Sequence, residues 1–107
     1  MSWHQYPAHF VGGACCANFV PHFVSGVLGR RFPTPFASPP FRGLSSSRVN
    51  VLYALLNLAL AWALVLGVGA FDPRALLDAG AFGLGFAAWS LMLTRSVARL
   101  QREGLEL

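Results

Sequence analysis

The sequence predicts an all-α membrane protein with three transmembrane helices, its N-terminus outside and its C-terminus in the cytoplasm. The chain has 107 residues, of which 55% are hydrophobic and 11% are charged, whereas soluble domains average about 25% charged residues. Three apolar stretches, at about 8–29, 49–71 and 75–94, are each long enough to cross a bilayer core of about 30 Å. The basic residues, which are all arginines, are distributed asymmetrically around these stretches.

The arginines predict the orientation of the chain. Only Arg74 lies in the second connection, and no lysine or arginine precedes Arg30. Because basic residues accumulate on the cytoplasmic side, the segments that contain the other seven are expected there. Their spread around apolar runs favours a lipid bilayer as partner and argues against nucleic acid. These predicted interface residues are Arg30, Arg31, Arg42, Arg48, Arg95, Arg99 and Arg102.

The first stretch is the most polar of the three. It contains His9, Asn18, Pro21 and His22, and polar groups are costly in lipid unless they face protein or water. Pro21 removes a backbone hydrogen bond and is expected to kink the helix. An alternative is a helix that lies in the membrane interface, which would move the N-terminus to the cytoplasm and leave the other two helices as they are.

The connection at 30–48 is rich in proline and phenylalanine. Its prolines exclude a regular helix. Two interpretations stay open: the segment lies along the membrane interface with its rings inward and its arginines toward phosphate, or it is a plain exposed linker. The residues concerned are Phe32, Pro33, Pro35, Phe36, Pro39, Pro40 and Phe41.

The second and third stretches form a hairpin in this interpretation. A serine within 45–47 is expected to cap the start of the second helix, and Asn50 and Asn57 share one face of it. A tight turn is expected at 72–74. The third helix begins with Asp78 in its first turn, where the helix dipole favours negative charge. It continues as a basic extension beyond position 94.

Small and polar residues mark the faces on which we expect helices to pack. Small residues allow close backbone approach in lipid, and polar residues turn toward protein. The same polar face is also compatible with a substrate or proton pathway, although the acidic residues fall near the membrane edge. The predicted packing residues are Gly13, Ala17, Asn18, Pro21, His22, Asn50, Asn57, Gly80 and Gly83.

His9 and His22 are the candidate cofactor ligands. They lie 13 positions apart on one helix, which corresponds to roughly 20 Å of rise. Histidines separated in this way hold haem in membrane cytochromes, with a second axial ligand that a partner chain would have to supply; a bacteriochlorophyll would need only one. Cys15 and Cys16 are adjacent, so they predict neither a structural bridge nor a four-ligand metal set. No catalytic constellation is recognisable, which favours a protein that is not an enzyme.

Several short runs resemble an uncharacterised family of small bacterial three-helix integral membrane proteins. They cover roughly residues 9–58, namely 9–13, 17–26, 29–30, 35–37, 39–40, 43–46 and 49–52. The resemblance implies a bacterial origin and a three-helix membrane domain, and it implies no activity. Phe41 falls where the resemblance would place a small residue such as glycine, which suggests that this loop is adapted to a particular contact.

The leading functional prediction is a non-enzymatic accessory or structural subunit in the bacterial inner membrane. It would pack against other chains of a respiratory or photosynthetic complex, or against itself, because three short helices enclose little space. The alternatives are a homo-oligomeric transporter or channel for protons or small solutes, and a subunit that ligates haem or a pigment.

Overall fold

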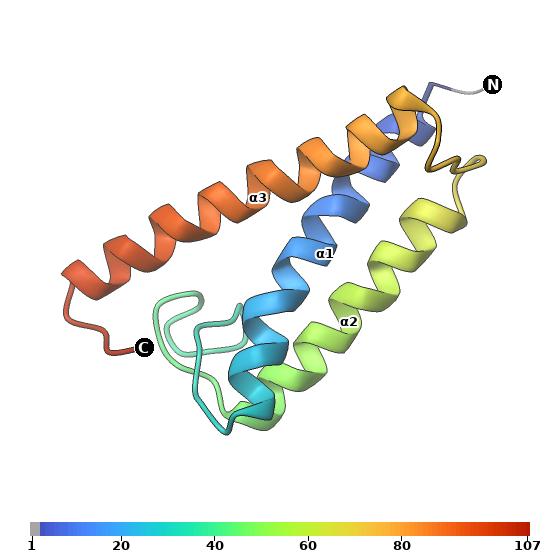
Figure 1. Ribbon diagram of the computed structural model, residues 1–107. Helices are drawn as coiled ribbons and strands as arrows, with labels where there is room; N and C mark the ends of the chain where they lie inside the picture. The colour runs from blue at the N-terminus through green and yellow to red at the C-terminus, as the bar shows by residue number, and fades with distance from the viewer. Residues whose placement is uncertain (1–2) are drawn as a thin grey trace.

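The chain forms three long helices. A computed structural model describes residues 3–107 and contains α1 (Gln5–Val27), α2 (Ser47–Leu66) and α3 (Leu76–Arg102) (Figure 1). Each helix is long and apolar enough to cross a membrane. The predicted all-α class with three candidate membrane spans is thereby confirmed. Pro21 lies inside α1, and the kink that we expect there stays a prediction.

The connection between α2 and α3 differs from the prediction. We expected the second helix to reach position 71 and a three-residue turn to follow, but α2 ends at Leu66 and the connection covers residues 67–75. The predicted helix end and the length of the connection are therefore wrong, whereas a turn does occur at the predicted place, where the Ala75 amide donates to the Asp72 carbonyl at 3.0 Å. Gly69 has a φ of +66°, a left-handed conformation that glycine adopts readily and that ends helical geometry. The three helices begin within three residues of the predicted positions. As expected, a serine caps the second helix: the Ser46 hydroxyl accepts a hydrogen bond from the Val49 amide.

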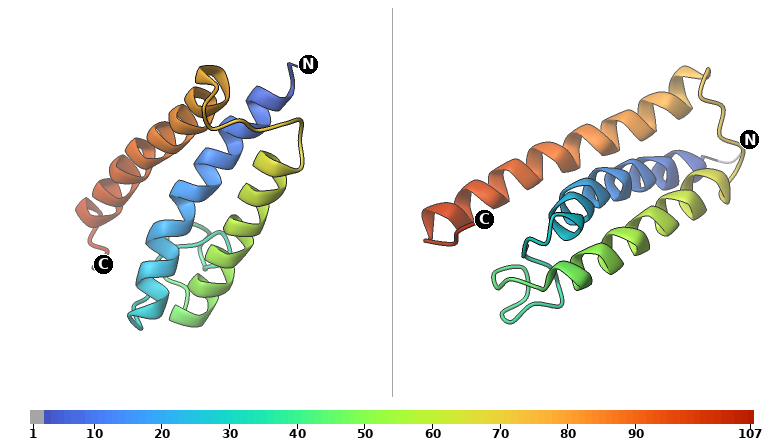
Figure 2. Two further views of the ribbon diagram at one scale, coloured as in Figure 1. Left: turned by 45° about the vertical axis from the view of Figure 1, so that its right-hand side comes forward. Right: turned by 60° about the horizontal axis from the view of Figure 1, so that its bottom comes forward.

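Helix α1 lies in the middle of the molecule. It packs against both α2 and α3, which hardly touch each other, as the two views of Figure 2 show. The start of α1 lies near the α2–α3 connection, and the C-terminus lies at the opposite end, beside the α1–α2 loop (Figure 1). Toward that end α3 diverges from the other two helices, so the loop fills part of the space beneath it.

Glycines bring the helix backbones together. A Cβ atom added to Gly13 of α1 would lie 2.0 Å from the Phe82 carbonyl oxygen of α3, and one added to Gly85 would lie 1.8 Å from the Phe10 carbonyl oxygen of α1. Because real Cβ atoms do not approach that closely, neither position has room for a side chain. This mutual approach is the usual means by which helices pack in lipid.

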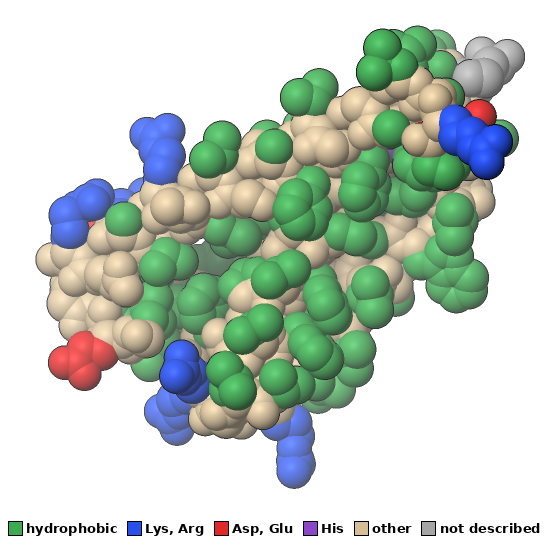
Figure 3. Space-filling model, viewed as in Figure 1, with side chains coloured by type: hydrophobic (Ala, Val, Ile, Leu, Met, Phe, Trp, Pro, Cys, Tyr) green, Lys and Arg blue, Asp and Glu red, His purple; other side chains and the backbone are tan. Residues whose placement is uncertain are grey.

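The interior of the fold is polar and its surface is apolar. The largest fully buried side chains are all polar, whereas Leu76 and Trp62 are 85% and 69% exposed. Figure 3 shows hydrophobic side chains over much of the visible face. In water this distribution would be costly, because buried polar groups are not favoured and apolar area would stay hydrated. It fits helices surrounded by hydrocarbon. The buried polar set is Gln5, His9, Thr34, Asn50 and Asp78.

The α1–α2 loop is a folded element, which differs from a plain exposed linker. An antiparallel bridge joins Phe32 to Ser45, and the Thr34 and Ser45 hydroxyls lie 2.5 Å apart in a buried hydrogen bond. The Thr34 carbonyl accepts from the Phe41 amide at 2.9 Å. Phe41 itself has a φ of +62°. That left-handed conformation suits glycine and costs about 1–2 kcal/mol for other residues, so this position is strained.

Candidate functional site

Three groups of polar side chains follow α1 from one end to the other. The first lies near the N-terminus, the second in the middle of the helix and the third next to the α1–α2 loop. Each group joins α1 to another helix or to a connection by hydrogen bonds. Together they form a polar seam inside an otherwise apolar bundle, and we define them below by their residues.

The outer cluster consists of Gln5, His9 and Asp78. Asp78 is 2% exposed and its carboxylate accepts from Gln5 Nε2 and from the Asp72 amide, each at 3.0 Å. His9 is fully buried: its Nε2 lies 3.2 Å from the Val68 carbonyl and its Nδ1 lies 3.4 Å from Asp78 Oδ1. Since a carbonyl only accepts, Nε2 carries a hydrogen. Both ring nitrogens thus face groups of this chain.

Asn18 connects all three helices. Its amide nitrogen donates to the Tyr53 hydroxyl at 3.3 Å and to Asn57 Oδ1 at 3.2 Å, both on α2. Its amide oxygen accepts from Trp89 Nε1 on α3 at 3.0 Å. Asn57 in turn donates to the Tyr53 carbonyl at 2.9 Å. Both hydrogens of the Asn18 amide are therefore used in bonds within the chain.

His22 and Asn50 tie α1 to α2 and to the loop. Asn50 Nδ2 lies within 3.0–3.3 Å of the carbonyl oxygens of Phe32, Ser45 and Ser46, so it must be the donor end of the amide. Asn50 Oδ1 then faces His22 Nδ1 at 2.7 Å, and His22 Nδ1 donates to it. His22 is 4% exposed, and its ring packs edge-on against Phe32 and Tyr53.

The two histidines therefore differ as cofactor ligands. His9 Nε2 donates to the Val68 carbonyl, and Nδ1 lies 3.4 Å from Asp78 Oδ1 without making a hydrogen bond to any described residue. The side chain is fully buried, which leaves no room beside it for an iron or a pigment metal. His22 Nε2 has no hydrogen-bond partner within residues 3–107, and His22 lines a cavity of about 320 Å³. No group of three or more His, Cys, Asp or Glu side chains that could hold a metal ion occurs within those residues either.

The predicted packing residues divide into an inner and an outer set. Gly80 and Gly83 lie on the outside of α3, where an added Cβ would meet no atom within 4 Å. Pro21 is partly buried beside a groove between α1 and α3. The remaining residues are buried within the chain, and these are Gly13, Ala17, Asn18, His22, Asn50 and Asn57.

The seven predicted interface arginines are all exposed. They belong to the loop, to the start of α2 and to the last third of α3. Figure 3 shows basic side chains gathered at the end of the molecule that carries the loop and the C-terminus, with another at the opposite end. Arg42 Nη1 lies 3.1 Å from Glu103 Oε1 and links the loop to the end of α3. Both side chains are largely exposed, so this pair adds little stability.

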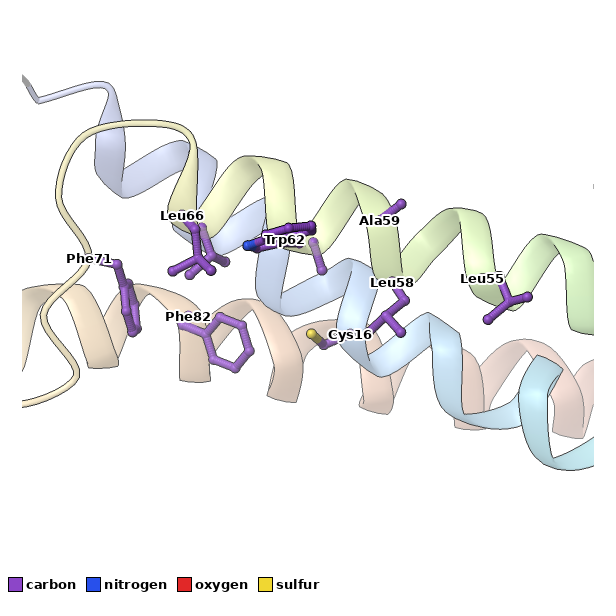
Figure 4. Close-up of a pocket in the computed structure, with 10 residues that line it drawn as sticks. Cys16, Leu55, Leu58, Ala59, Trp62, Leu66, Phe71 and Phe82 are labelled. Carbon is purple, nitrogen blue, oxygen red and sulfur yellow. The ribbon is translucent and has the colours of Figure 1, made fainter.

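An apolar hollow of about 650 Å³ lies between α2 and α3 at the other end of the bundle. Figure 4 shows Trp62 and Leu58 of α2 facing Phe82 of α3 across it, with Cys16 of α1 at its floor. The hollow is open and has almost no polar lining. Cys15 and Cys16 are free and partly buried, as expected for small apolar side chains. Acyl chains are suitable occupants of such a surface.

Sequence reasoning missed some members of the seam. Gln5 was not singled out, although its spacing of four from His9 places both on one helix face. Asp78 was assigned to the helix dipole, and its bond to Gln5 spans 73 positions. Trp89 and Tyr53 gave no signal of their roles, because aromatic residues are common in any membrane helix. Thr34 was not predicted to be buried, because it lies in a proline-rich segment that gives no periodic pattern.

The fold and the polar seam together define an all-α protein with three candidate membrane spans and a hydrogen-bonded polar interior. Comparisons with protein families, with curated proteins and with solved structures found no match. What the chain does is therefore inferred below from its own residues.

Proposed function

We propose that this protein is a non-enzymatic subunit of a bacterial inner-membrane assembly, and that the exposed face of α3 docks on another membrane chain. In this proposal all three helices cross the membrane with the N-terminus outside and the C-terminus in the cytoplasm. The arginines at the loop and C-terminal end support that orientation. The resemblance to small bacterial membrane proteins supports the origin.

The proposal depends on how little of α3 is buried. In the most apolar 18-residue stretch of α3 only 11% of the residues are buried within the chain, against 33% in α1. Its outward face combines open glycines with exposed leucines. Gly83 and Ala87 are four residues apart and both exposed, which is the small-xxx-small spacing at which helices approach closely in lipid. This docking face consists of Leu76, Gly80, Gly83, Leu84, Ala87 and Leu91.

The polar seam favours a packing role over a transport role. A pathway through the Asn18–His22 face would need polar groups open to water or to a solute. Asn18 instead bonds to both α2 and α3, and His22 bonds to Asn50. The polar groups of this face are largely used in holding the chain together, which leaves few of them to line a pathway.

Leucine substitutions on the docking face test the proposal. In Gly83→Leu/Ala87→Leu, two bulky side chains would keep a partner helix away while meeting no atom of this chain at Gly83. We expect the variant to insert and fold, since leucine is a better helix former than glycine. After extraction in mild detergent, native mass spectrometry should find wild type in a larger assembly and the variant as a monomer.

A matched control lies on α2. Ala59 and Ala63 have the same spacing, are both exposed and face away from α1. Ala59→Leu/Ala63→Leu should therefore leave the assembly intact. The proposal is contradicted if wild type is a monodisperse monomer under these conditions, or if the two double variants dissociate equally.

A further inference from the structure

The cavity beside His22 has the features of a built binding site. It lies between the three helices and the α1–α2 loop, at the end where α3 diverges, and has a volume of about 320 Å³. Its lining is mostly apolar, and Arg99 is the only charged residue in it. That combination, an apolar hollow with a few polar groups, is typical of small-molecule sites. The aromatic residues that line it are Phe32, Phe41, Tyr53 and Trp89.

His22 offers this cavity an unused acceptor. Its Nδ1 donates to Asn50 Oδ1 at 2.7 Å, because the three carbonyls around Asn50 Nδ2 fix the orientation of that amide. In a neutral imidazole the other nitrogen is then an acceptor. Nε2 has no partner within the described residues, although the side chain is 96% buried, as its 4% exposure implies.

Tyr53 offers an unused donor next to it. The Tyr53 hydroxyl accepts from Asn18 Nδ2 at 3.3 Å, and its own hydrogen has no acceptor within residues 3–107. The His22 and Tyr53 ring centroids are only 4.7 Å apart. A hydroxyl group accepts one hydrogen bond and donates another. Both residues line the cavity, so a ligand hydroxyl placed between these two groups would satisfy both.

An apolar surface groove adjoins the cavity. It runs between α1 and α3, is lined by Ala17, Val20 and Phe86 among others, and is about 500 Å³ in volume. Phe32, Leu93 and Val97 line both the groove and the cavity. A ligand with a hydroxylated head in the cavity would therefore carry its apolar tail past these three side chains into the groove.

We propose that the cavity binds the head of a membrane-dissolved quinol, with a ring hydroxyl between His22 and Tyr53 and the isoprenoid tail in the groove. The aromatic walls suit a planar ring. The volume is at the lower end of ligand pockets, which suits one ring rather than a tetrapyrrole. Phe41 adds to this wall from its left-handed backbone, a strain that is often found at binding sites. The proposal stands independently of the docking face on α3.

Binding can be followed through Trp89, which lines the cavity. In the double variant Trp3→Phe/Trp62→Phe, Trp89 is the one tryptophan left. The tryptophan fluorescence of this purified variant is titrated with decylubiquinol and, separately, with the dimethyl ether of decylubiquinol, which lacks the hydroxyl hydrogens. We expect saturable quinol binding and at least tenfold weaker binding of the ether. Tyr53→Phe should weaken quinol binding about tenfold, the effect of one lost hydrogen bond.

Two exposed phenylalanines supply a matched pair of controls. Phe41 and Phe10 are 61% and 40% exposed, and only Phe41 lines the cavity. Phe41→Ala should weaken quinol binding and Phe10→Ala should not. Absence of saturable binding, equal binding of quinol and ether, or equal effects of the two alanine variants would overturn the proposal. Equal binding would mean that water, rather than a ligand hydroxyl, bridges His22 and Tyr53.

Discussion

At the residue scale, stability depends on a few polar side chains. In hydrocarbon, apolar contacts between helices have little advantage over contacts with lipid, so hydrogen bonds and close packing decide which helices associate. Asn18 makes three interhelical hydrogen bonds from one side chain. The sequence predicted Asn18 as a packing residue, but it did not indicate which side chains of α2 and α3 it would meet.

Asn18→Leu should destabilise the bundle by about 2 kcal/mol, because interhelical hydrogen bonds in membranes average about 0.6 kcal/mol and three are lost. Leucine has a similar size, so packing changes less than hydrogen bonding. Unfolding by SDS titration from detergent micelles would measure the difference. Thr94→Val removes only a bond within α3 and should stay within about 0.5 kcal/mol of wild type. Equal stability of the two variants would contradict the role of Asn18.

At the element scale, α1 organises the molecule. Its apolar span is the least hydrophobic of the three, and it lies between the other two helices. The polar residues that make α1 the least hydrophobic membrane span are therefore the ones that bond it to α2 and α3. The glycines follow the same logic: Gly13 and Gly85 face the backbone of a neighbouring helix, whereas Gly83 faces outward. The sequence predicted Gly13 and Gly83 as packing residues and did not single out Gly85, which only the packed structure places against α1.

Substituting the third-helix glycines should have opposite effects on stability. Gly85→Ala would place a methyl group 1.8 Å from the Phe10 carbonyl oxygen, so α1 and α3 must move apart, at a cost of about 1–3 kcal/mol. Gly83→Ala meets no atom within 4 Å and should stabilise α3 by up to about 1 kcal/mol through helix propensity. Thermal unfolding in detergent compares them, and shifts of the same sign would contradict this packing.

At the scale of the whole molecule, polarity is inverted and charge is one-sided. Polar side chains lie inside, apolar ones cover the outside, and seven of the eight arginines lie in the loop, at the start of α2 and at the end of α3. An even number of spans would put both termini on one side, whereas three spans separate them. The orientation of the chain is therefore testable without knowledge of any partner.

Reporter fusions at residue 2 and at residue 107 should place the N-terminus outside and the C-terminus in the cytoplasm. The reason is that the segments with seven arginines resist translocation. Alkaline phosphatase and green fluorescent protein, each fused separately at either end, report opposite sides of the membrane. Two cytoplasmic termini would contradict the three-span topology and would favour an α1 that lies in the interface.

The sequence by itself determined the class of the protein: three apolar helices, their approximate bounds, the serine cap of α2 and the charge asymmetry. These features are local, and they follow from composition and from short-range chemistry. It also indicated that one face of α1 would seek protein contacts. The predicted end of the second helix lies five residues beyond the observed one. The reason is that the apolar run continues past Leu66, whereas the backbone leaves the helix at Gly67 and Gly69.

Only the tertiary structure decided which residues meet. Asp78 joins Gln5 and His9 across the whole chain, and Asn50 holds a loop that composition alone would leave as a linker. The physical reason is that helices with apolar surfaces on every side have little periodicity to mark an inner face. Their pairing depends on a few polar and small residues, whose partners are distant in sequence and become neighbours only when the helices pack.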